Sequence, residues 1–404
     1  MRFSNSCKKR FFYVGNFFSD SMRIERGIFT DSPAATQKIT EISLSIRGAG
    51  ERIWLISLGR GQSNLPFQYF SARAGRIRGV PVIYLPFIKT PTITHLFTLF
   101  ALFLQVVLIT NQKSVVIYYN YLQHYLLSII SLRLLGRRFI IDIEDGYRQD
   151  EGGLKSKVEK FLLSFYCWLS KDRVMMASTN ILNKKLTQKP FICYGVSPPR
   201  ILKDKWDKAP LKVLLGGSLL PDTGSDLFIK ALQLYNSKYL KESHQIKFIV
   251  TGFGEASERL RNLANGELKG ILTFYGIVTD AEYSAIANDC HIGLCLKIPS
   301  RSMGDTTFPS KAIDLVSRGL LLISTKVSDI PLIFDSESAI LLDQPTPENL
   351  LDAVVWVSNN CNNSKLIALR GTHKINALLS PLNVGNKLIE FWQGNGSNNQ
   401  LFTK

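Results

Sequence analysis

Along most of the chain, short runs of continuous apolar residues alternate with segments in which apolar residues recur at helical spacing. Leu320–Ser324 is typical of a strand that is buried on both faces, and Asp226–Tyr235 is typical of an amphipathic helix. Strand, helix and strand at this spacing predict a parallel sheet. The expected strands are residues 11–15, 53–58, 80–85, 115–119, 139–143, 174–177, 191–194, 211–216, 245–251, 271–275, 291–296, 320–324 and 339–342, and the expected helices are residues 32–47, 96–109, 120–135, 154–170, 226–235, 256–264, 280–287, 309–319, 347–357 and 383–392, with a long loop at 16–32.

The pattern repeats in two halves, which are separated by a segment that breaks regular structure. Gly195–Pro199 contains two prolines, which lack backbone donors and restrict the residues before them, and polar residues 200–210 follow. The chain is therefore expected to be an α/β protein with two doubly wound, Rossmann-like domains. The expected domains are residues 1–198 and 199–380, followed by a closing helix and polar tail at 381–404.

Residues 90–112 carry no formal charge, and Leu96–Ile109 is almost wholly apolar. A membrane-spanning helix needs about 20 apolar residues. This run is shorter, contains Thr98 and Gln105, and is followed at once by another expected strand. A buried or interfacial helix is therefore expected here rather than a membrane span.

Charge distinguishes the two halves. The first 200 residues hold 28 Lys and Arg against 12 Asp and Glu, whereas the remainder holds 21 against 20. A basic half suggests an anionic partner such as lipid headgroups or nucleic acid. The basic residues are dispersed, and no nucleic-acid-binding motif accompanies them, so nucleic acid is not expected. An anionic membrane surface or a solvated basic face remain the two alternatives.

The six cysteines are scattered, and the spacing of Cys290 and Cys295 is not repeated in a second metal-ligand pair. We expect free thiols in a reducing compartment. The first apolar run, Phe11–Gly15, is too short for the core of a signal peptide. A cytoplasmic protein, peripheral to the inner face of the membrane, is therefore expected.

The stretch Gly304–Pro331 holds the clearest candidate chemistry of the second half. Pro309 suits the first turn of a helix, and Gly319 suits its end. Ser310 and Lys311 would place free amides and a cation at the helix start, which favours an anion, and Asp314 could accept from a sugar hydroxyl one turn later. The alternative is an ordinary helix–strand unit with a solvated Lys and Asp.

Two pairs of glycines end strands on the same side of this domain. Gly216 and Gly217 follow one expected strand, and Gly252 and Gly254 follow the next. Glycine lets a backbone approach a phosphate closely, although neither pair forms the dinucleotide-binding pattern. Together with Ser310, these loops predict a site of nucleotide size.

Acidic residues follow a strand of the first half, in the sequence IDIEDG. Ligands of open parallel sheets gather at the carboxyl ends of the strands. Alternation points Asp142 and Glu144 to one face and Asp145 to the other. These residues are either solvated loop acids or carboxylates that orient an acceptor hydroxyl or take its proton. His124 is a further candidate, but a lone histidine on an apolar helix favours a structural role.

These motifs resemble retaining, nucleotide-sugar-dependent glycosyltransferases of family four, which have the GT-B fold. The resemblance runs through GGSLLPDTGSD, VTGFGE, LTFYGIVTDAEYSAIANDCHIGLCL and FPSKAIDLVSRG, and covers most of residues 211–360. It is looser in the first half, where it rests on the strand at 11–15, the helix SPAATQKITEISLSIRGAG and the linker CYGVSPP. The resemblance implies two facing domains, an acceptor side and a donor side, with a final helix that crosses back.

Position by position, the resemblance assigns the donor diphosphate to Gly216, Gly217, Ser310 and Lys311, and the donor ribose to Asp314. The sequence departs from the family at the first of two glutamates, where Thr306 stands beside Asp305. Two basic positions of the first donor-side loop are Ser218 and Thr223 here, so Lys311, Lys297 and Arg301 are candidate replacements for that charge.

The resemblance implies sugar transfer with retention and without a metal or other cofactor, because a helix start and Lys311 would neutralise the leaving diphosphate. Glu144 and Asp145 are then the catalytic candidates on the acceptor side. The expected acceptor is a lipid-linked molecule or a polysaccharide at the cytoplasmic membrane surface. Two alternatives remain: a nucleotide-sugar epimerase of the same fold, and a catalytically silent binding protein.

Overall fold

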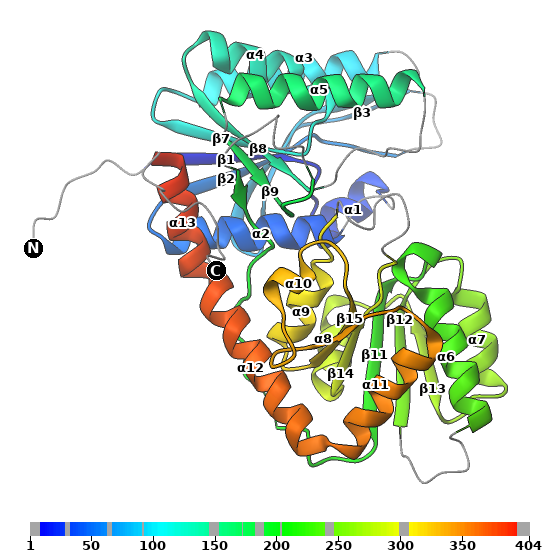
Figure 1. The fold of residues 1–404 in the computed structure, drawn as a ribbon. Helices are drawn as coiled ribbons and strands as arrows, with labels where there is room; N and C mark the ends of the chain where they lie inside the picture. Colours follow the sequence, from blue (N-terminus) through cyan, green and yellow to red (C-terminus); the bar gives the residue numbers. More distant parts are fainter. Residues whose placement is uncertain are drawn as a thin grey trace, which may run out of the picture. The chain divides into compact units, whose positions relative to one another are not determined.

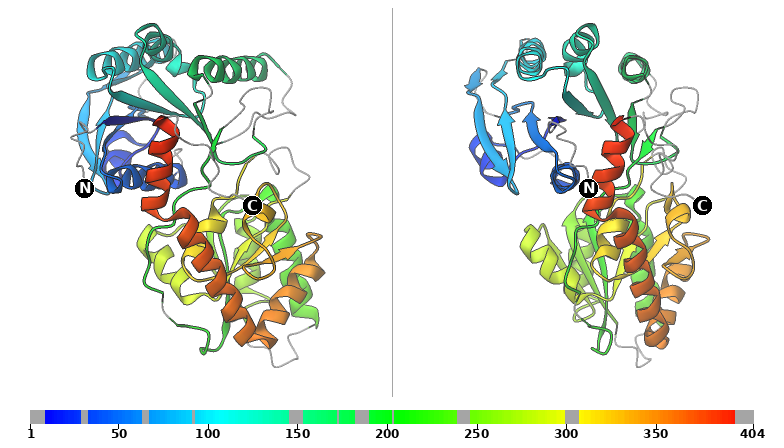
Figure 2. Two further views of the ribbon diagram at one scale, coloured as in Figure 1. Left: turned by 60° about the vertical axis from the view of Figure 1, so that its left-hand side comes forward. Right: turned by 90° about the vertical axis from the view of Figure 1, so that its left-hand side faces the viewer.

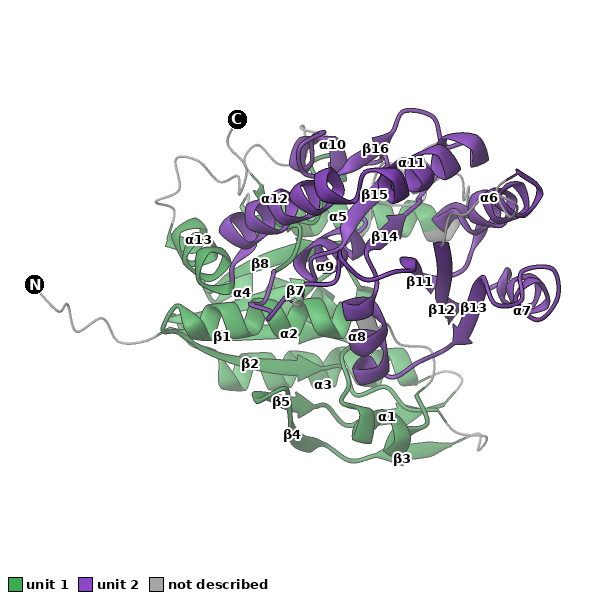
Figure 3. Ribbon diagram, turned by 90° about the horizontal axis from the view of Figure 1, so that it is seen from below, with its two compact units in different colours: residues 1–196, 381–404 green, residues 197–380 purple. Residues whose placement is uncertain are grey.

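A computed structural model of the chain describes residues 9–28, 33–62, 67–90, 93–144, 153–171, 173–181, 190–202, 204–238, 246–298 and 307–393. The chain divides into two compact units (Figure 3). Unit 1 comprises residues 1–196 and 381–404, and unit 2 comprises residues 197–380. The sequence-based boundary lay after residue 198, and the segment from residue 381, expected as a separate closing part, groups with unit 1.

Unit 1 is built on a sheet whose strands follow the order β10-β9-β8-β7-β1-β2-β5-β4. Neighbouring strands are parallel except for β4, which runs antiparallel to β5 at the edge. The strands are β1 (Arg10–Gly15), β2 (Arg52–Ser57), β4 (Arg73–Ile77), β5 (Val80–Tyr84), β7 (Ser114–Tyr119), β8 (Arg138–Ile143), β9 (Val174–Met176) and β10 (Phe191–Ile192), and a separate antiparallel pair joins β3 (Gln68–Phe70) to β6 (Phe87–Lys89).

Helices cover both faces of this sheet (Figures 1 and 2). The helices α3, α4 and α5 form a layer on one face, and α2 lies on the other face with α13 packed against it. A Cβ atom on Gly385 would lie 2.2 Å from the Ser45 carbonyl oxygen, so glycine allows α13 to contact α2 closely. The helices are α1 (Asp20–Arg26), α2 (Pro33–Gly48), α3 (Thr94–Ile109), the 3-10 helix η1 (Gln123–Tyr125), α4 (Leu126–Leu134), α5 (Leu154–Ser170) and α13 (Pro381–Gln393).

Unit 2 is a second doubly wound fold. Its sheet is parallel throughout, in the order β13-β12-β11-β14-β15-β16. The strands are β11 (Leu211–Ser218), β12 (Ile246–Phe253), β13 (Leu272–Gly276), β14 (Ile292–Cys295), β15 (Leu321–Thr325) and β16 (Ile340–Leu342). The helices are the 3-10 helix η2 (Pro221–Thr223), α6 (Ser225–Lys238), α7 (Ser257–Asn265), α8 (Asp280–Asp289), α9 (Lys311–Ser317), α10 (Ile330–Ile333), α11 (Pro347–Asn359) and α12 (Cys361–Leu379).

The expected α/β pattern is confirmed in both units, but several elements differ, and the strands β3, β4 and β6 and the short helix α10 were not predicted. Residues 16–32 were expected to be a loop, but Ser19 caps the short helix α1 by accepting from the Met22 N–H at 3.3 Å. The helix expected from residue 120 begins at Leu126, because Asn120 adopts a positive φ of 60° after β7. The helix α12 was not predicted.

The apolar segment of unit 1 is the helix α3, and it is partly exposed rather than fully buried. Among the described residues, no helix is both long enough and apolar enough to cross a membrane. The helix expected at residues 96–109 in place of a membrane span is present as α3, so the prediction of a helix is confirmed.

Candidate functional site

The carboxyl end of β11 presents bare backbone between two side chains of unit 2. A Cβ atom on Gly217, whose φ is +98°, would lie 3.3 Å from the Lys311 Nζ. A Cβ atom on Gly216 would lie 3.1 Å from both the Thr251 Oγ1 and the Tyr283 ring. The two glycines thus open a backbone surface that Lys311 and Tyr283 border, at the edge of the sheet where doubly wound proteins bind ligands.

The packing of the chain itself requires glycine at positions 252 and 254, whether or not a ligand binds. A Cβ atom on Gly252 would lie 1.8 Å from the Gly217 carbonyl oxygen, and one on Gly254 would lie 2.5 Å from the Leu219 carbonyl oxygen. Both residues also have a positive φ, +109° and +156°. They let the end of β12 pack against the loop after β11, and their expected contact with a donor stays a prediction.

Lys311 brings a cation to this backbone surface. Its side chain is half-buried, and burial lowers the pKa of its ammonium, while the nearby Cys295 thiol acts in the opposite direction. In the part of the chain that the structure describes, no carboxylate forms an ion pair with it. A partly dehydrated cation without an acidic partner favours an anion beside Gly217.

The start of α9 differs from the expectation in two respects. The helix begins at Lys311, so Pro309 precedes it. The N–H groups of Ala312 and Ile313 donate to the carbonyl oxygens of Pro309 and Ser310 at 2.9 and 3.1 Å. The free amides were predicted at Ser310 and Lys311, and the prediction is wrong at Ser310, whose N–H donates to the Phe308 carbonyl oxygen at 3.0 Å. An anion here would therefore depend on the Lys311 ammonium more than on the helix start. Ser310 is exposed at the cap position and makes no side-chain cap bond.

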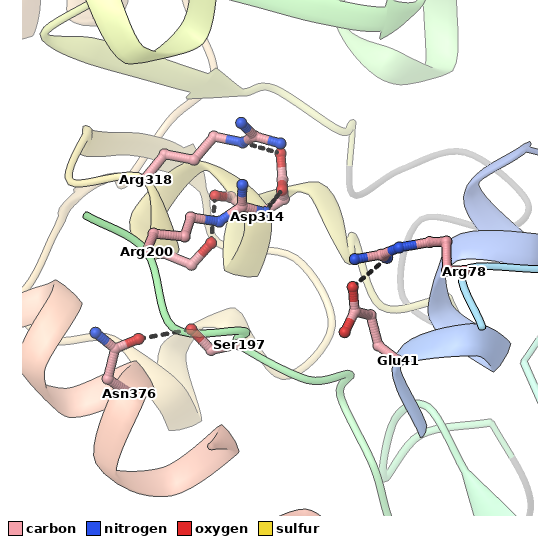
Figure 4. A network of polar contacts seen from close by, with 8 residues as sticks. Glu41, Arg78, Ser197, Arg200, Asp314, Arg318 and Asn376 are labelled. Carbon is pink, nitrogen blue, oxygen red and sulfur yellow. Dashed lines mark hydrogen bonds and ion pairs between the residues drawn. The ribbon is translucent and has the colours of Figure 1, made fainter. Parts of the chain in front are cut away.

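Asp314 lies on α9 between two arginines (Figure 4). Its Oδ1 accepts from the Arg200 Nη2 and its Oδ2 accepts from the Arg318 Nε, both at 2.9 Å. Arg200 comes from the segment that opens unit 2, where the Ser197 hydroxyl donates to the Asn376 Oδ1 at 2.6 Å. The carboxylate that was expected to accept from a sugar hydroxyl is thus engaged on both oxygens.

Tyr283 connects this ion cluster to the end of β11. The Arg318 guanidinium lies 5.1 Å from the centre of the Tyr283 ring, and the Tyr283 phenol lies near Asp314. Burial, together with the negative charge of Asp314, raises the pKa of Tyr283. The Arg318 side chain is 5% exposed, and Asp314 provides the counter-charge for its buried guanidinium. The sequence analysis did not predict a role for Arg200, Arg318 or Tyr283. Only Arg318 could have been recognised from the sequence, because it follows Asp314 by four residues on the same helix.

The positions at which the sequence departs from the family pattern have structural roles or lie outside the described residues. The Thr223 hydroxyl donates to the Ser218 carbonyl oxygen at 2.7 Å and accepts from the Leu220 N–H at 3.1 Å, which closes the turn after β11. The Lys297 ammonium donates to the Thr307 carbonyl oxygen at 3.1 Å. Arg301, Asp305 and Thr306 lie outside the described residues.

Unit 1 has its own polar cluster at the carboxyl ends of its strands. The Tyr13 hydroxyl of β1 donates to the Asp142 Oδ2 of β8, and Lys38 of α2 forms an ion pair with Glu144. The Glu144 N–H donates to the Asn120 Oδ1 at 2.8 Å. Both carboxylates lie near Lys38, as the predicted common face requires. Asp145 lies outside the described residues.

Burial dominates the electrostatics of this cluster. It raises the pKa of Asp142 to about 6, although Lys38 acts in the opposite direction.

Burial also lowers the pKa of His124 to about 4, with His95 and Arg60 adding to the effect, so this imidazole is neutral at pH 7. Its Nε2 lies 2.9 Å from the His95 Nδ1. Among the described residues, no group of three or more His, Cys, Asp or Glu side chains could hold a metal ion.

Comparison with known proteins places these two units in a common architecture. Residues 210–360 match the family model described as glycosyl transferases group 1. No curated protein sequence matches the chain. Sucrose-phosphate synthase from Thermosynechococcus elongatus has a similar structure, with 11% sequence identity, coverage of 96% of this chain and 99% of that chain, and a TM-score of 0.64. Anabaena HepE in complex with UDP and glucose has 12% identity, coverage of 96% of this chain and 100% of that chain, and a TM-score of 0.64. A variant of S. aureus TarM in complex with fondaparinux, alpha-GlcNAc-glycerol and UDP has 10% identity, coverage of 96% of this chain and 99% of that chain, and a TM-score of 0.60.

At these identities the structural likeness shows the fold alone, and the family model concerns residues 210–360 alone. The expected fold class is confirmed by both. The chain thus has the GT-B fold, and its residues 210–360 are similar to the group 1 glycosyl transferases.

Proposed function

We propose that the chain transfers a sugar from a nucleotide-sugar donor, bound at the carboxyl edge of the unit 2 sheet, to a hydroxyl group of an acceptor. The observation that carries the proposal is the Lys311 ammonium beside Gly217, half-buried and without an acidic partner among the described residues. Exposed backbone and a cation that has no acidic partner among the described residues suit a diphosphate. HepE, which has the same fold, is in complex with UDP and glucose, and this supports the donor class.

The sugar transfer itself is proposed to proceed with retention, as in family four, and without a metal. Lys311 would bind the leaving diphosphate and stabilise the negative charge that develops on it when the bond to the sugar breaks. Gly217 would allow the phosphate to approach the backbone. Asp314, held by Arg200 and Arg318, would fix Tyr283 at the wall of the site and would reach the ribose only as a partner shared with the arginines.

Unit 1 would bind the acceptor, and its candidate catalytic groups remain Glu144 and Asp145. The ion pair with Lys38 orients Glu144 but also competes with any proton that Glu144 would accept. We propose a polysaccharide or a lipid-linked molecule at the cytoplasmic face of a membrane as the acceptor. The glycan-like ligands of TarM, the basic first half of the chain and the free thiols of the five described cysteines support this class and place.

One observation favours the catalytically silent alternative. Both oxygens of Asp314 accept from arginines, so the carboxylate assigned to the ribose is already satisfied within the chain. A silent protein would bind a nucleotide weakly or not at all and would transfer no sugar.

The test is a transfer assay on the full chain with a panel of labelled UDP, GDP and ADP sugars and a membrane extract as the acceptor source. The proposal predicts label in the lipid-linked or polysaccharide fraction, and the same yield when a chelator is present. Release of an altered nucleotide sugar without acceptor would favour the epimerase instead. No turnover of any donor, by a chain that binds none of them, would contradict the proposal.

A further inference from the structure

The helix α3 exposes a continuous apolar stripe. Thr98, Leu102 and Val106 are buried, and residues two positions away on a helix point to roughly the opposite side, about 200° around the axis. That opposite side carries large apolar residues at intervals of four, and Leu108 is 80% exposed. The members of the stripe are Leu96, Phe100, Leu104 and Leu108.

The helix α5 exposes a second stripe. Phe161, Phe165 and Trp168 follow helical spacing and stack on one another, with ring centres 5.7 and 6.0 Å apart. Phe161 is 63% exposed and Trp168 is 72% exposed. Large aromatic side chains at such exposure are uncommon on a surface that contacts only water.

The two stripes belong to one layer of unit 1. The helix α3 packs against α4, α4 packs against α5, and all three lie on the same face of the sheet (Figures 1 and 2). We give the name α3–α5 surface to the exposed leucine and phenylalanine residues of α3 together with the two exposed aromatic residues of α5. It comprises Leu96, Phe100, Leu104, Leu108, Phe161 and Trp168.

Basic residues accompany this surface. The three helices contain one acidic residue, Glu159. Exposed basic side chains lie on these helices and directly beside them, namely Lys113, Arg133, Arg138, Lys157 and Lys171. Aromatic and leucine side chains with basic neighbours match the two parts of an anionic bilayer surface, its acyl boundary and its headgroups. A protein partner fits less well, because lysine is depleted from protein–protein interfaces.

We propose that the α3–α5 surface docks on an anionic lipid bilayer, with α3 lying along the plane of the membrane. This inference deepens the proposed function, because it names the surface that would bring the chain to a membrane-borne acceptor. The leucines and aromatic residues enter the acyl boundary, and the basic side chains contact the phosphates of the lipids. The helix α3 has 16 residues, a length of about 24 Å, and lies on the bilayer rather than across it.

The test is co-sedimentation of the full chain with phosphatidylcholine vesicles, with and without phosphatidylglycerol. The wild type is expected to bind the anionic vesicles more tightly, and the double variant Leu104→Glu/Leu108→Glu is expected to lose at least about tenfold in affinity. The matched control is Leu366→Glu/Leu369→Glu on α12, two exposed leucines of unit 2, which is expected to bind like the wild type.

A second variant and a salt series test the two parts of the surface separately. Phe161→Ser/Trp168→Ser is expected to weaken binding and to remove the fluorescence shift that Trp168 gives on entering lipid. Lys157→Ala/Lys171→Ala is expected to lose roughly fivefold for each charge, and the loss is expected to shrink at high salt.

Three results would overturn the inference. They are no vesicle binding by the wild type, an equal loss in the control, and a dimer in sedimentation velocity that Leu104→Glu/Leu108→Glu dissociates while vesicles stay unbound. Nucleotide binding, measured in solution on the same samples, separates this inference from the proposed function: an intact titration with no vesicle binding contradicts the docking surface alone.

Discussion

Replacing Lys311 by methionine removes the ammonium and keeps an unbranched side chain of similar length. One charge-assisted hydrogen bond to a diphosphate contributes roughly 1.5–3 kcal/mol. The substitution is therefore expected to weaken binding of a nucleoside diphosphate roughly 10- to 150-fold. The expected cause is local, because the Lys311 Nζ lies 3.3 Å from the point where a Gly217 Cβ would stand.

The same substitution weakens nucleotide binding but is not expected to destabilise the chain in the absence of nucleotide. Burial lowers the pKa of Lys311 in the folded chain below its ordinary value. Between those two pKa values the unfolded chain binds more protons, so this group makes the wild type more stable as the pH rises through that window. Lys311→Met lacks this dependence and is expected to be at least as stable as the wild type at pH 7.

Isothermal titration with UDP, GDP and ADP measures the first effect, and urea unfolding at neutral and alkaline pH measures the second. Lys374→Met is the control, because the Lys374 Nζ lies 2.7 Å from an Asp335 oxygen on the surface of unit 2. The control is expected to bind nucleotide normally and to lose no more than about 1 kcal/mol of stability. Unchanged affinity in Lys311→Met, or a loss of stability in place of affinity, would refute the reasoning.

Three further predictions concern stability. Gly252→Ala is expected to cost about 2–4 kcal/mol in urea unfolding, because its Cβ would lie 1.8 Å from the Gly217 carbonyl oxygen; a variant as stable as the wild type contradicts this packing. Asp314→Asn is expected to cost about 2–4 kcal/mol, because the buried Arg318 loses its counter-charge, and an unchanged urea midpoint would count against the ion cluster. Burial raises the pKa of Asp142 to about 6, so between about pH 4 and 6 the folded chain binds more protons than the unfolded chain and loses stability as the pH rises. Asp142→Asn is expected to flatten this part of the profile of Tm against pH. Parallel profiles for the variant and the wild type would contradict this prediction.

The parallel strands of both sheets were predictable because buried parallel strands are continuous apolar runs, as in Leu321–Thr325, whereas the exposed antiparallel edge strand β4 was not predicted. Elements that bury few apolar side chains were not. The helix α1 buries only Met22 and Arg26 among its residues. The helix α12 buries Ser364, Gly371 and Thr372 along with its apolar residues, which weakens the apolar stripe in the sequence.

The candidate site divides in the same way. Topology alone brings the end of β11 to the start of α9, so the closeness of Gly217 and Lys311 could be predicted from strand ends. The pair of Arg200 and Asp314 joins residues 114 positions apart, and no local pattern encodes it. Local pattern also cannot separate a glycine that faces a ligand from one that faces its own backbone, as Gly252 does.

Chemical labelling of lysines in the presence of nucleotide sugars tests the central claim most directly, because it reports on Lys311 itself. The full chain is treated with an amine-reactive reagent, with and without each donor, and the modified peptides are quantified by mass spectrometry. The account predicts that one class of donor protects Lys311 while Lys374 reacts equally in both samples. Equal labelling of Lys311 at saturating concentrations of every donor would contradict it.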